Sequence, residues 1–95
     1  MSNDIIVYDD DVVEGQIVSV AYPVSEELFY AVQNRIEHLM ELATRGEHSK
    51  TIGKGELREY FGTPPGVTGA ILRWSYEHPT PKMKRLSRNI SWGDE

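Results

Sequence analysis

The side chains with the most evident chemical potential are basic residues near the C-terminal end of the chain. Four of them fall within seven positions: Lys82, Lys84, Arg85 and Arg88. Clustered cations of this kind can contact nucleic-acid phosphates even on a protein whose net charge is negative. The cluster therefore favours phosphate binding by the C-terminal half.

The N-terminal half has the opposite chemistry, because Asp9, Asp10 and Asp11 are consecutive and Glu14 follows closely. Carboxylates can chelate a hard cation, but this spacing and the missing loop glycine do not fit an EF-hand. A solvated acidic turn is indicated. The same charges can steer a partner protein toward this half.

Other sites for catalysis or for metals are not indicated. The chain has no cysteine, which excludes disulfides, thiolate chemistry and cysteine-ligated zinc. His38, His48 and His78 lack metal-ligand spacing, and Gly53-Lys54-Gly55 lacks the hydroxyl residue of a phosphate loop. We therefore expect no enzyme activity, no cofactor and no metal.

The length and the charge distribution of the chain limit the fold and the partners that these residues can have. The 95 residues predict one small domain, residues 1–95, in a soluble cytoplasmic protein without a membrane segment. The net charge is −5, but residues 1–47 hold ten acids against two bases and residues 48–95 hold eight bases against five acids. A nucleic acid would therefore meet the second half. The two halves can also simply attract each other or confer solubility.

Two elements are predicted in the first half. Residues 1–24 are rich in Ile and Val around the acidic stretch, which predicts a β-hairpin or two short strands. Residues 25–46 predict one long amphipathic helix, with Ser25 as N-cap and Gly46 as its end. Its apolar residues recur at helical spacing: Leu28, Val32, Ile36, Leu39, Met40 and Ala43.

Residues 55–78 predict a helix-turn-helix. A short helix over residues 56–61 ends at Gly62, and the stiff connection Thr63-Pro64-Pro65-Gly66 follows. A second helix then runs until Pro79 forbids continuation. Its core-facing residues are Val67, Ala70, Ile71 and Trp74.

The stretch from Glu56-Leu57-Arg58-Glu59-Tyr60-Phe61-Gly62 through Arg73 resembles the helix-turn-helix and winged-helix units of bacterial and phage transcriptional regulators. The resemblance implies that the second helix reads DNA with the residues that point away from the core. The predicted DNA-binding residues on it are Thr68, Leu72, Arg73 and Tyr76. Arg73 would pair with a guanine edge or a phosphate, and Leu72 would touch a thymine methyl. Alternatively, this is an ordinary surface helix on which Leu72 and Tyr76 mark a protein interface.

A fainter similarity covers more of the chain. Thr51-Ile52-Gly53, Phe61-Gly62-Thr63-Pro64 and His78-Pro79-Thr80-Pro81 are arranged like parts of the winged-helix domain of alkyltransferase-like DNA-binding proteins. That family's reactive cysteine would fall within residues 84–90, where this chain has none. The similarity therefore implies a noncatalytic DNA-binding relative.

Residues 82–92 alternate apolar and polar side chains in their second part, which predicts a basic C-terminal strand or wing. Lys82, Lys84 and Arg85 would then rest on the phosphate backbone. The fold class expected is thus α+β, from hairpin to long helix to helix-turn-helix to basic strand.

Two functions follow from these patterns and stay open here. The first is a small transcriptional regulator that binds double-stranded DNA as a homodimer, since one unit buries little surface. The second is a phage- or plasmid-type inhibitor or adaptor. It would contact a host protein, such as a nucleic-acid enzyme, through Asp9, Asp10, Asp11 and Glu14.

Overall fold

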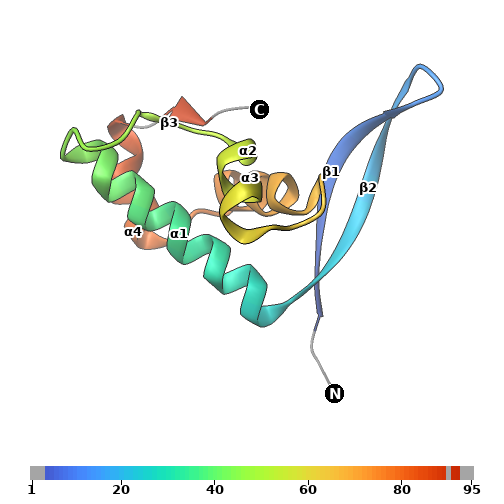
Figure 1. Cartoon of the computed structure of the whole chain (residues 1–95), viewed down its shortest axis with the longest axis horizontal. Helices are drawn as coiled ribbons and strands as arrows, with labels where there is room; N and C mark the ends of the chain where they lie inside the picture. Colours follow the sequence, from blue (N-terminus) through green and yellow to red (C-terminus); the bar gives the residue numbers. More distant parts are fainter. Residues whose placement is uncertain (1–3, 90, 93–95) are drawn as a thin grey trace.

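The computed structural model describes residues 4–89 and 91–92, and these form the α+β fold that the sequence predicts (Figure 1). An antiparallel hairpin comes first, and the long helix α1 follows it. The shorter helices α2, α3 and α4 come next along the chain. A small parallel sheet joins β3 (Thr51–Ile52) to β4 (Ser91–Trp92).

The hairpin consists of β1 (Asp4–Val13) and β2 (Gln16–Ser25). Val13 lies opposite Gln16, so that Glu14 and Gly15 alone make the turn. Both turn residues have positive φ, 51° and 78°, as a type I′ turn requires. β1 continues through the acidic stretch without a break, because the Asp9 and Asp10 side chains find cations on the helices.

Helix α1 (Glu26–Thr44) begins and ends where the sequence predicts, to within one residue. The Leu28 N–H donates to Ser25 Oγ at 3.2 Å, and Glu26 and Glu27 lie at the positive end of the helix dipole. Gly46 follows the helix with φ +77°. The buried face of α1 supplies much of the core: Phe29, Val32, Ile36, Leu39, Met40 and Ala43.

Helices α2 (Lys54–Phe61) and α3 (Val67–Glu77) are the two predicted helices of the helix-turn-helix segment. Gly62 ends α2 in the left-handed conformation, φ 64° and ψ 30°. Helix α3 then passes between α1 and the hairpin, with β1 lying along it (Figure 1). Buried residues therefore occur all around α3 rather than on one stripe: Thr68, Gly69, Ala70, Ile71, Leu72 and Ser75.

The C-terminal segment corrects one expectation. The first five residues of the predicted basic strand or wing, 82–86, belong to helix α4 (Pro81–Leu86), and a 3-10 turn spans Ser87–Asn89. The helix begins because Thr80 Oγ1 accepts from the Met83 N–H at 3.1 Å and Pro81 occupies the first turn. Met83 is fully buried. Strand character is limited to β4, and Ile90 lies outside the described residues.

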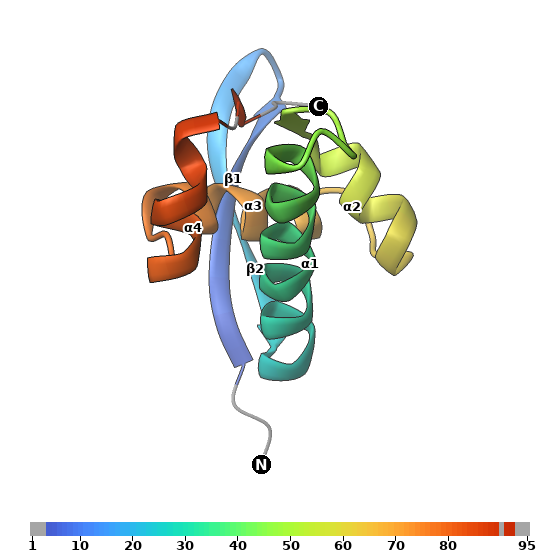
Figure 2. The same ribbon diagram turned by 90° about the vertical axis from the view of Figure 1, so that its left-hand side faces the viewer.

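Helices α2 and α4 lie on opposite sides of α1 (Figure 2). The hairpin lies beyond α3, so its outer side is not covered by the helices (Figure 1). Among the described residues, no helix combines the length and the apolarity needed to cross a bilayer.

Candidate functional site

The predicted reading face of α3 does not form in the structure. Thr68 and Leu72 are buried, so neither can reach a DNA base or phosphate as predicted. The Thr68 hydroxyl donates to the Lys54 carbonyl oxygen at 3.4 Å. The prediction was wrong because the Thr68–Leu72 face of α3 turns toward the other helices and the core, whereas β1 reaches α3 at Gly69 and Arg73. Gly69 was the missed signal for β1, since a residue without a side chain lets Asp9 and Lys54 come close to the helix.

Arg73 and Tyr76 reach the surface, but Arg73 is engaged within the protein. Its Nη1 lies 3.1 Å from Asp10 Oδ1 on β1, and its Nε lies 3.8 Å from Glu77 Oε2 one turn along α3. The hydrogen bond to Asp10 and the charge of that carboxylate raise the pKa of Arg73. Tyr76 is exposed, as predicted. Arg73 thus joins the hairpin to α3, and a nucleic acid would have to compete with Asp10 for it.

The four residues of the basic cluster separate into two groups. Lys82 forms a hydrogen-bonded ion pair with Glu41 on α1. The hydrogen bond from Lys82 is the main reason that the pKa of Glu41 is lowered. Lys84, Arg85 and Arg88 are exposed. Within residues 4–89 and 91–92, no ion pair to these three cations is found, so three charges of the predicted phosphate surface remain open to a partner.

The acidic residues of the hairpin also separate into an ion-paired group and an exposed group. Asp9 Oδ2 lies 3.9 Å from Lys54 Nζ on α2, and Asp10 pairs with Arg73. Asp11 is exposed and accepts a hydrogen bond from the Val12 N–H, while Glu14 lies exposed in the turn. Asp11 and Glu14 are thus the carboxylates that can act on a partner protein, whereas Asp9 and Asp10 attach the hairpin to the helices.

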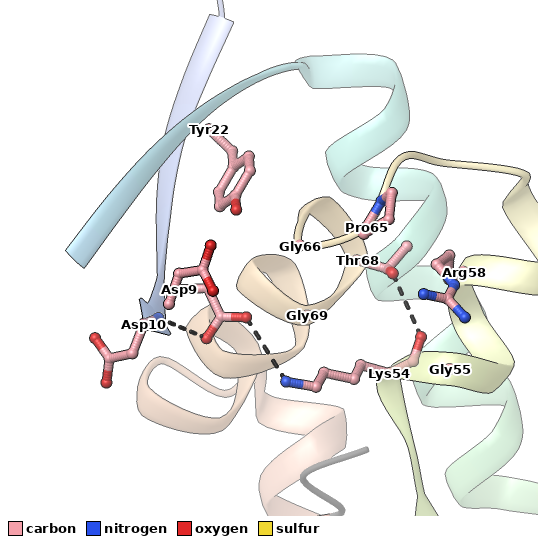
Figure 3. A pocket seen from close by; sticks show the side chains of 11 residues that line it. Asp9, Asp10, Tyr22, Lys54, Gly55, Arg58, Pro65, Gly66, Thr68 and Gly69 are labelled. Atoms are coloured by element: carbon pink, nitrogen blue, oxygen red, sulfur yellow. Dashed lines mark hydrogen bonds and ion pairs between the residues drawn. The ribbon is translucent and has the colours of Figure 1, made fainter. Parts of the chain in front are cut away.

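A cleft of about 300 Å³ lies where β1 and β2 meet α2 and the start of α3 (Figure 3). Carboxylates from β1 line one wall and Lys54 and Arg58 line the other. Asp9 and Lys54 face each other across the cleft (Figure 3). Because the opposite charges partly neutralise each other, the cleft offers no strong field for a ligand of either sign.

Two glycines allow these walls to approach each other. A Cβ on Gly69 would lie 2.8 Å from Asp9 Oδ2 and 2.9 Å from Lys54 Cδ. A Cβ on Gly66 would collide with the Tyr22 hydroxyl, and Gly66 also has φ +96°. The cleft is therefore a junction between the hairpin and the helices.

His48 also forms its hydrogen bonds within the protein. Its Nδ1 is 2.6 Å from the Ser49 carbonyl oxygen and its Nε2 is 2.8 Å from Glu56 Oε2. Both partners accept hydrogen bonds, so the protonated imidazole suits the site, and the bond to Glu56 raises the pKa of His48. In the described part of the chain, no three His, Asp or Glu side chains are grouped so as to hold a metal ion.

The exposed apolar side chains of the hairpin form a surface that the sequence reasoning missed. On the face of β1 opposite Val7, three side chains are apolar and exposed: Ile6 is 43% exposed, Tyr8 53% and Val12 66%. Ile17 on β2 lies opposite Val12 and is 75% exposed. We call these four side chains the outer apolar face. Asp10 on the same face of β1 pairs with Arg73, and Tyr8 also lines a pocket with Trp74 and His78. The opposite face of β1 carries the fully buried Val7.

The outer apolar face has a signal in the sequence. The runs Ile5-Ile6-Val7-Tyr8 and Val20-Ala21-Tyr22 do not alternate between apolar and polar residues. Unbroken apolar runs are typical of strands that are buried on both faces. The core covers the Val7 face, and α3 reaches the other face only in part, through the Arg73–Asp10 ion pair and a pocket that Tyr8 lines with Trp74.

Comparison with protein-family models, with curated proteins and with solved structures finds no match to this chain.

Proposed function

We propose that this protein is a noncatalytic adaptor or inhibitor that binds a partner protein on the outer apolar face of its β1–β2 hairpin. A cytoplasmic location is part of the proposal. The observation that carries it is the exposure of Ile6, Tyr8, Val12 and Ile17 on one face of a two-stranded sheet. Exposed apolar side chains gathered on one face of a small protein are typical of protein interfaces.

The energetic argument rests on surface that remains exposed. Val12 and Ile17 form a cross-strand pair near the turn and are exposed by two thirds or more. Completing the burial of such a side chain contributes on the order of 1–2 kcal/mol, at about 25 cal/mol per Å² of apolar surface. An aromatic residue such as Tyr8 is also a frequent interface anchor, because it buries a large area at low entropy cost.

The charges near the turn indicate the chemistry of the partner. Asp11 and Glu14 are exposed and have no cation within the described ion pairs. A partner with basic residues around an apolar centre would be steered toward this end of the hairpin. DNA would be repelled from the same end.

A second function, DNA binding, is favoured by one observation. Lys84, Arg85 and Arg88 are exposed on α4 and the 3-10 turn after it. Three phosphate contacts would give a salt dependence with a log–log slope of about −3, so binding would weaken steeply with salt. The burial of Thr68 and Leu72 leaves such binding without the predicted base contacts.

The experiment compares the two faces of one strand. The double variant Tyr8→Ser, Val12→Ser changes the outer apolar face, and Val13→Ser changes a 49% exposed residue on the opposite side of β1. Affinity capture from nuclease-treated lysate of the producing cells identifies candidate partners, and calorimetry with the purified candidate gives the affinity. We expect the double variant to lose at least tenfold in affinity, and Val13→Ser to change it much less.

The alternative has its own control. Replacing Lys84, Arg85 and Arg88 together with alanine should leave the captured protein unchanged. If this triple variant loses the interaction, and nuclease treatment abolishes it in the unaltered protein, the DNA-binding function is favoured and the protein-binding proposal is wrong.

A further inference from the structure

Strand β2 has an unusual composition for an edge strand. Its ten residues, Gln16–Ser25, include no charged side chain. The charges of the hairpin lie instead on β1 and in the turn: Asp4, Asp9, Asp10, Asp11 and Glu14. Exposed edges are normally protected from pairing by charged residues, by proline or by bulges. β2 therefore lacks the charged protection, and its proline, Pro23, lies near its end.

The turn determines which backbone groups of β2 face outward. In a hairpin with a two-residue turn, the flanking residues Val13 and Gln16 exchange backbone hydrogen bonds. Counting by twos, the N–H groups of Ile17, Ser19 and Ala21 then point to the free edge. Pro23 occupies the next outward position, so its lack of an N–H does not remove a hydrogen bond from the hairpin.

The free edge is also accessible. In the described part of the chain β2 pairs with β1 alone, and α3 packs mainly on β1. Figure 1 shows the middle of β2 on the side of the hairpin turned away from the helices. The backbone N–H and C=O groups of this edge pair with no strand in the described residues, while on one face of the sheet the Ser19 side chain lines a pocket with Arg73 and Trp74 of α3.

We infer that two copies of the chain pair through their β2 edges and form a four-stranded antiparallel sheet centred on Ser19. In this arrangement Ser19 lies opposite the same residue of the second copy, and Ile17 lies opposite Ala21. Pro23 then faces Gly15 of the turn, so the proline falls outside the new ladder. An antiparallel edge is self-complementary under a two-fold axis, so a second copy supplies a complete set of acceptors and donors.

Electrostatics favours a second copy at this edge over pairing at β1. The β1 strands of the two copies would be separated by three strand spacings, about 14 Å. That separation exceeds the Debye length of about 8 Å at physiological ionic strength, so their aspartates are largely screened from each other. Pairing through β1 would place the same acidic residues side by side.

The paired sheet has two consequences for the molecule. A two-stranded hairpin that extends beyond its helices is marginal by itself, and four strands give an independent sheet. The outer apolar faces of the two copies would also become one surface around the two-fold axis. The pairing does not depend on the proposed partner protein, because it uses backbone groups of β2 whereas that proposal uses side chains.

A proline substitution tests the backbone pairing directly. Ser19→Pro removes one outward N–H while the hairpin keeps its own ladder, and Ser19→Ala is the matched control that retains the N–H. By light scattering coupled to size exclusion, the unaltered protein and Ser19→Ala should have about twice the 10.8 kDa chain mass. Ser19→Pro should have the mass of one chain. A monomeric unaltered protein, or a dimeric Ser19→Pro that is folded by near-ultraviolet circular dichroism, would overturn the inference.

A second test does not depend on tolerance of proline. The chain has no cysteine, so Ser19→Cys introduces its only thiol. Opposed residues of an antiparallel pair lie about 5.5 Å apart between Cα atoms, within the range for a disulfide. Mild oxidation should crosslink Ser19→Cys into a dimer much faster than the exposed control Ser49→Cys, and equal rates would contradict the two-fold register.

The two proposals can fail separately. A monomeric Ser19→Pro that still captures a partner protein leaves both proposals standing. The variant Tyr8→Ser, Val12→Ser can lose that partner while it remains a dimer, and this result would support both. A protein that dimerises as inferred but captures no partner would remove the proposed function alone.

Discussion

Arg73 on α3 and Asp10 on β1 form an ion pair of 3.1 Å that fastens the hairpin to the helices. The sequence alone predicts outside partners for both side chains, DNA for the arginine and a host protein for the aspartate. The pair lies at the surface, and Glu77 also approaches the guanidinium at 3.8 Å. Its role is to fix the direction in which the hairpin leaves the body of the protein.

The first prediction follows from this pair. Arg73→Ala and Asp10→Asn should each weaken the attachment of the hairpin to the helices. The double variant should lose less stability than the sum of the two single losses, and this difference, the coupling energy, should decrease with added salt. Hydrogen exchange of the β1 amides reports the attachment. Strictly additive effects, unchanged by salt, would mean that the pair has no energetic part in holding the hairpin.

The second prediction concerns the burial of α3. Leu72→Ala should destabilise the protein by about 2–5 kcal/mol, because a buried leucine leaves a cavity when it is truncated. Val12→Ala on the exposed outer face should change stability by no more than about 0.5 kcal/mol. Urea unfolding followed by tryptophan fluorescence measures both values. Similar losses at the two positions would show that Leu72 is not in the core.

The third prediction compares two glycines with positive φ. Gly62 has φ 64° in open space, so Gly62→Ala should destabilise by about 1 kcal/mol. Gly66→Ala should be worse, because its φ is +96° and the new methyl would meet the Tyr22 ring.

A double variant separates the two causes at Gly66. In a Tyr22→Leu background the collision is relieved but the backbone strain remains, so Gly66→Ala should then cost less than it does alone. Thermal unfolding of the four proteins of this cycle provides the comparison. An unchanged penalty in the Tyr22→Leu background would assign the whole effect to backbone strain.

The fourth prediction is a pH dependence at His48. Hydrogen bonds to Glu56 and to the Ser49 carbonyl raise its pKa above the ordinary 6.5. A group whose folded-state pKa is raised stabilises the fold fully below its unfolded pKa and loses that contribution as the pH rises through the folded value. The stability difference between the unaltered protein and His48→Gln should therefore shrink as the pH rises above 6.5.

Imidazole titration by NMR gives a direct control for this prediction. Glu56→Gln removes the carboxylate, so the pKa of His48 should move back toward 6.5 in that variant. A titration midpoint that is the same with and without the Glu56 carboxylate would contradict the assigned cause.

The sequence by itself determined the features that depend on a few neighbouring residues. Ser25 followed by two glutamates specifies the start of α1, and Gly62 specifies the end of α2, because caps and left-handed positions act over one helical turn. The hairpin, the long helix and the two helices of residues 54–77 were predictable for this reason. The helix over Pro81–Leu86 has its start signal in Thr80 and Pro81, whereas the alternation of apolar and polar residues after it indicates a strand.

The tertiary structure decided which faces remain exposed. Helical periodicity assigned one face of α3 to the core, yet Thr68 and Leu72 on another face are buried against the helices, and β1 lies against the side where Arg73 meets Asp10. The same packing holds the middle of the hairpin and leaves Val12 and Ile17 near the turn exposed. A periodic pattern reports the average polarity of a face, whereas burial depends on contacts between segments far apart in the chain, and these are fixed only when the whole core packs.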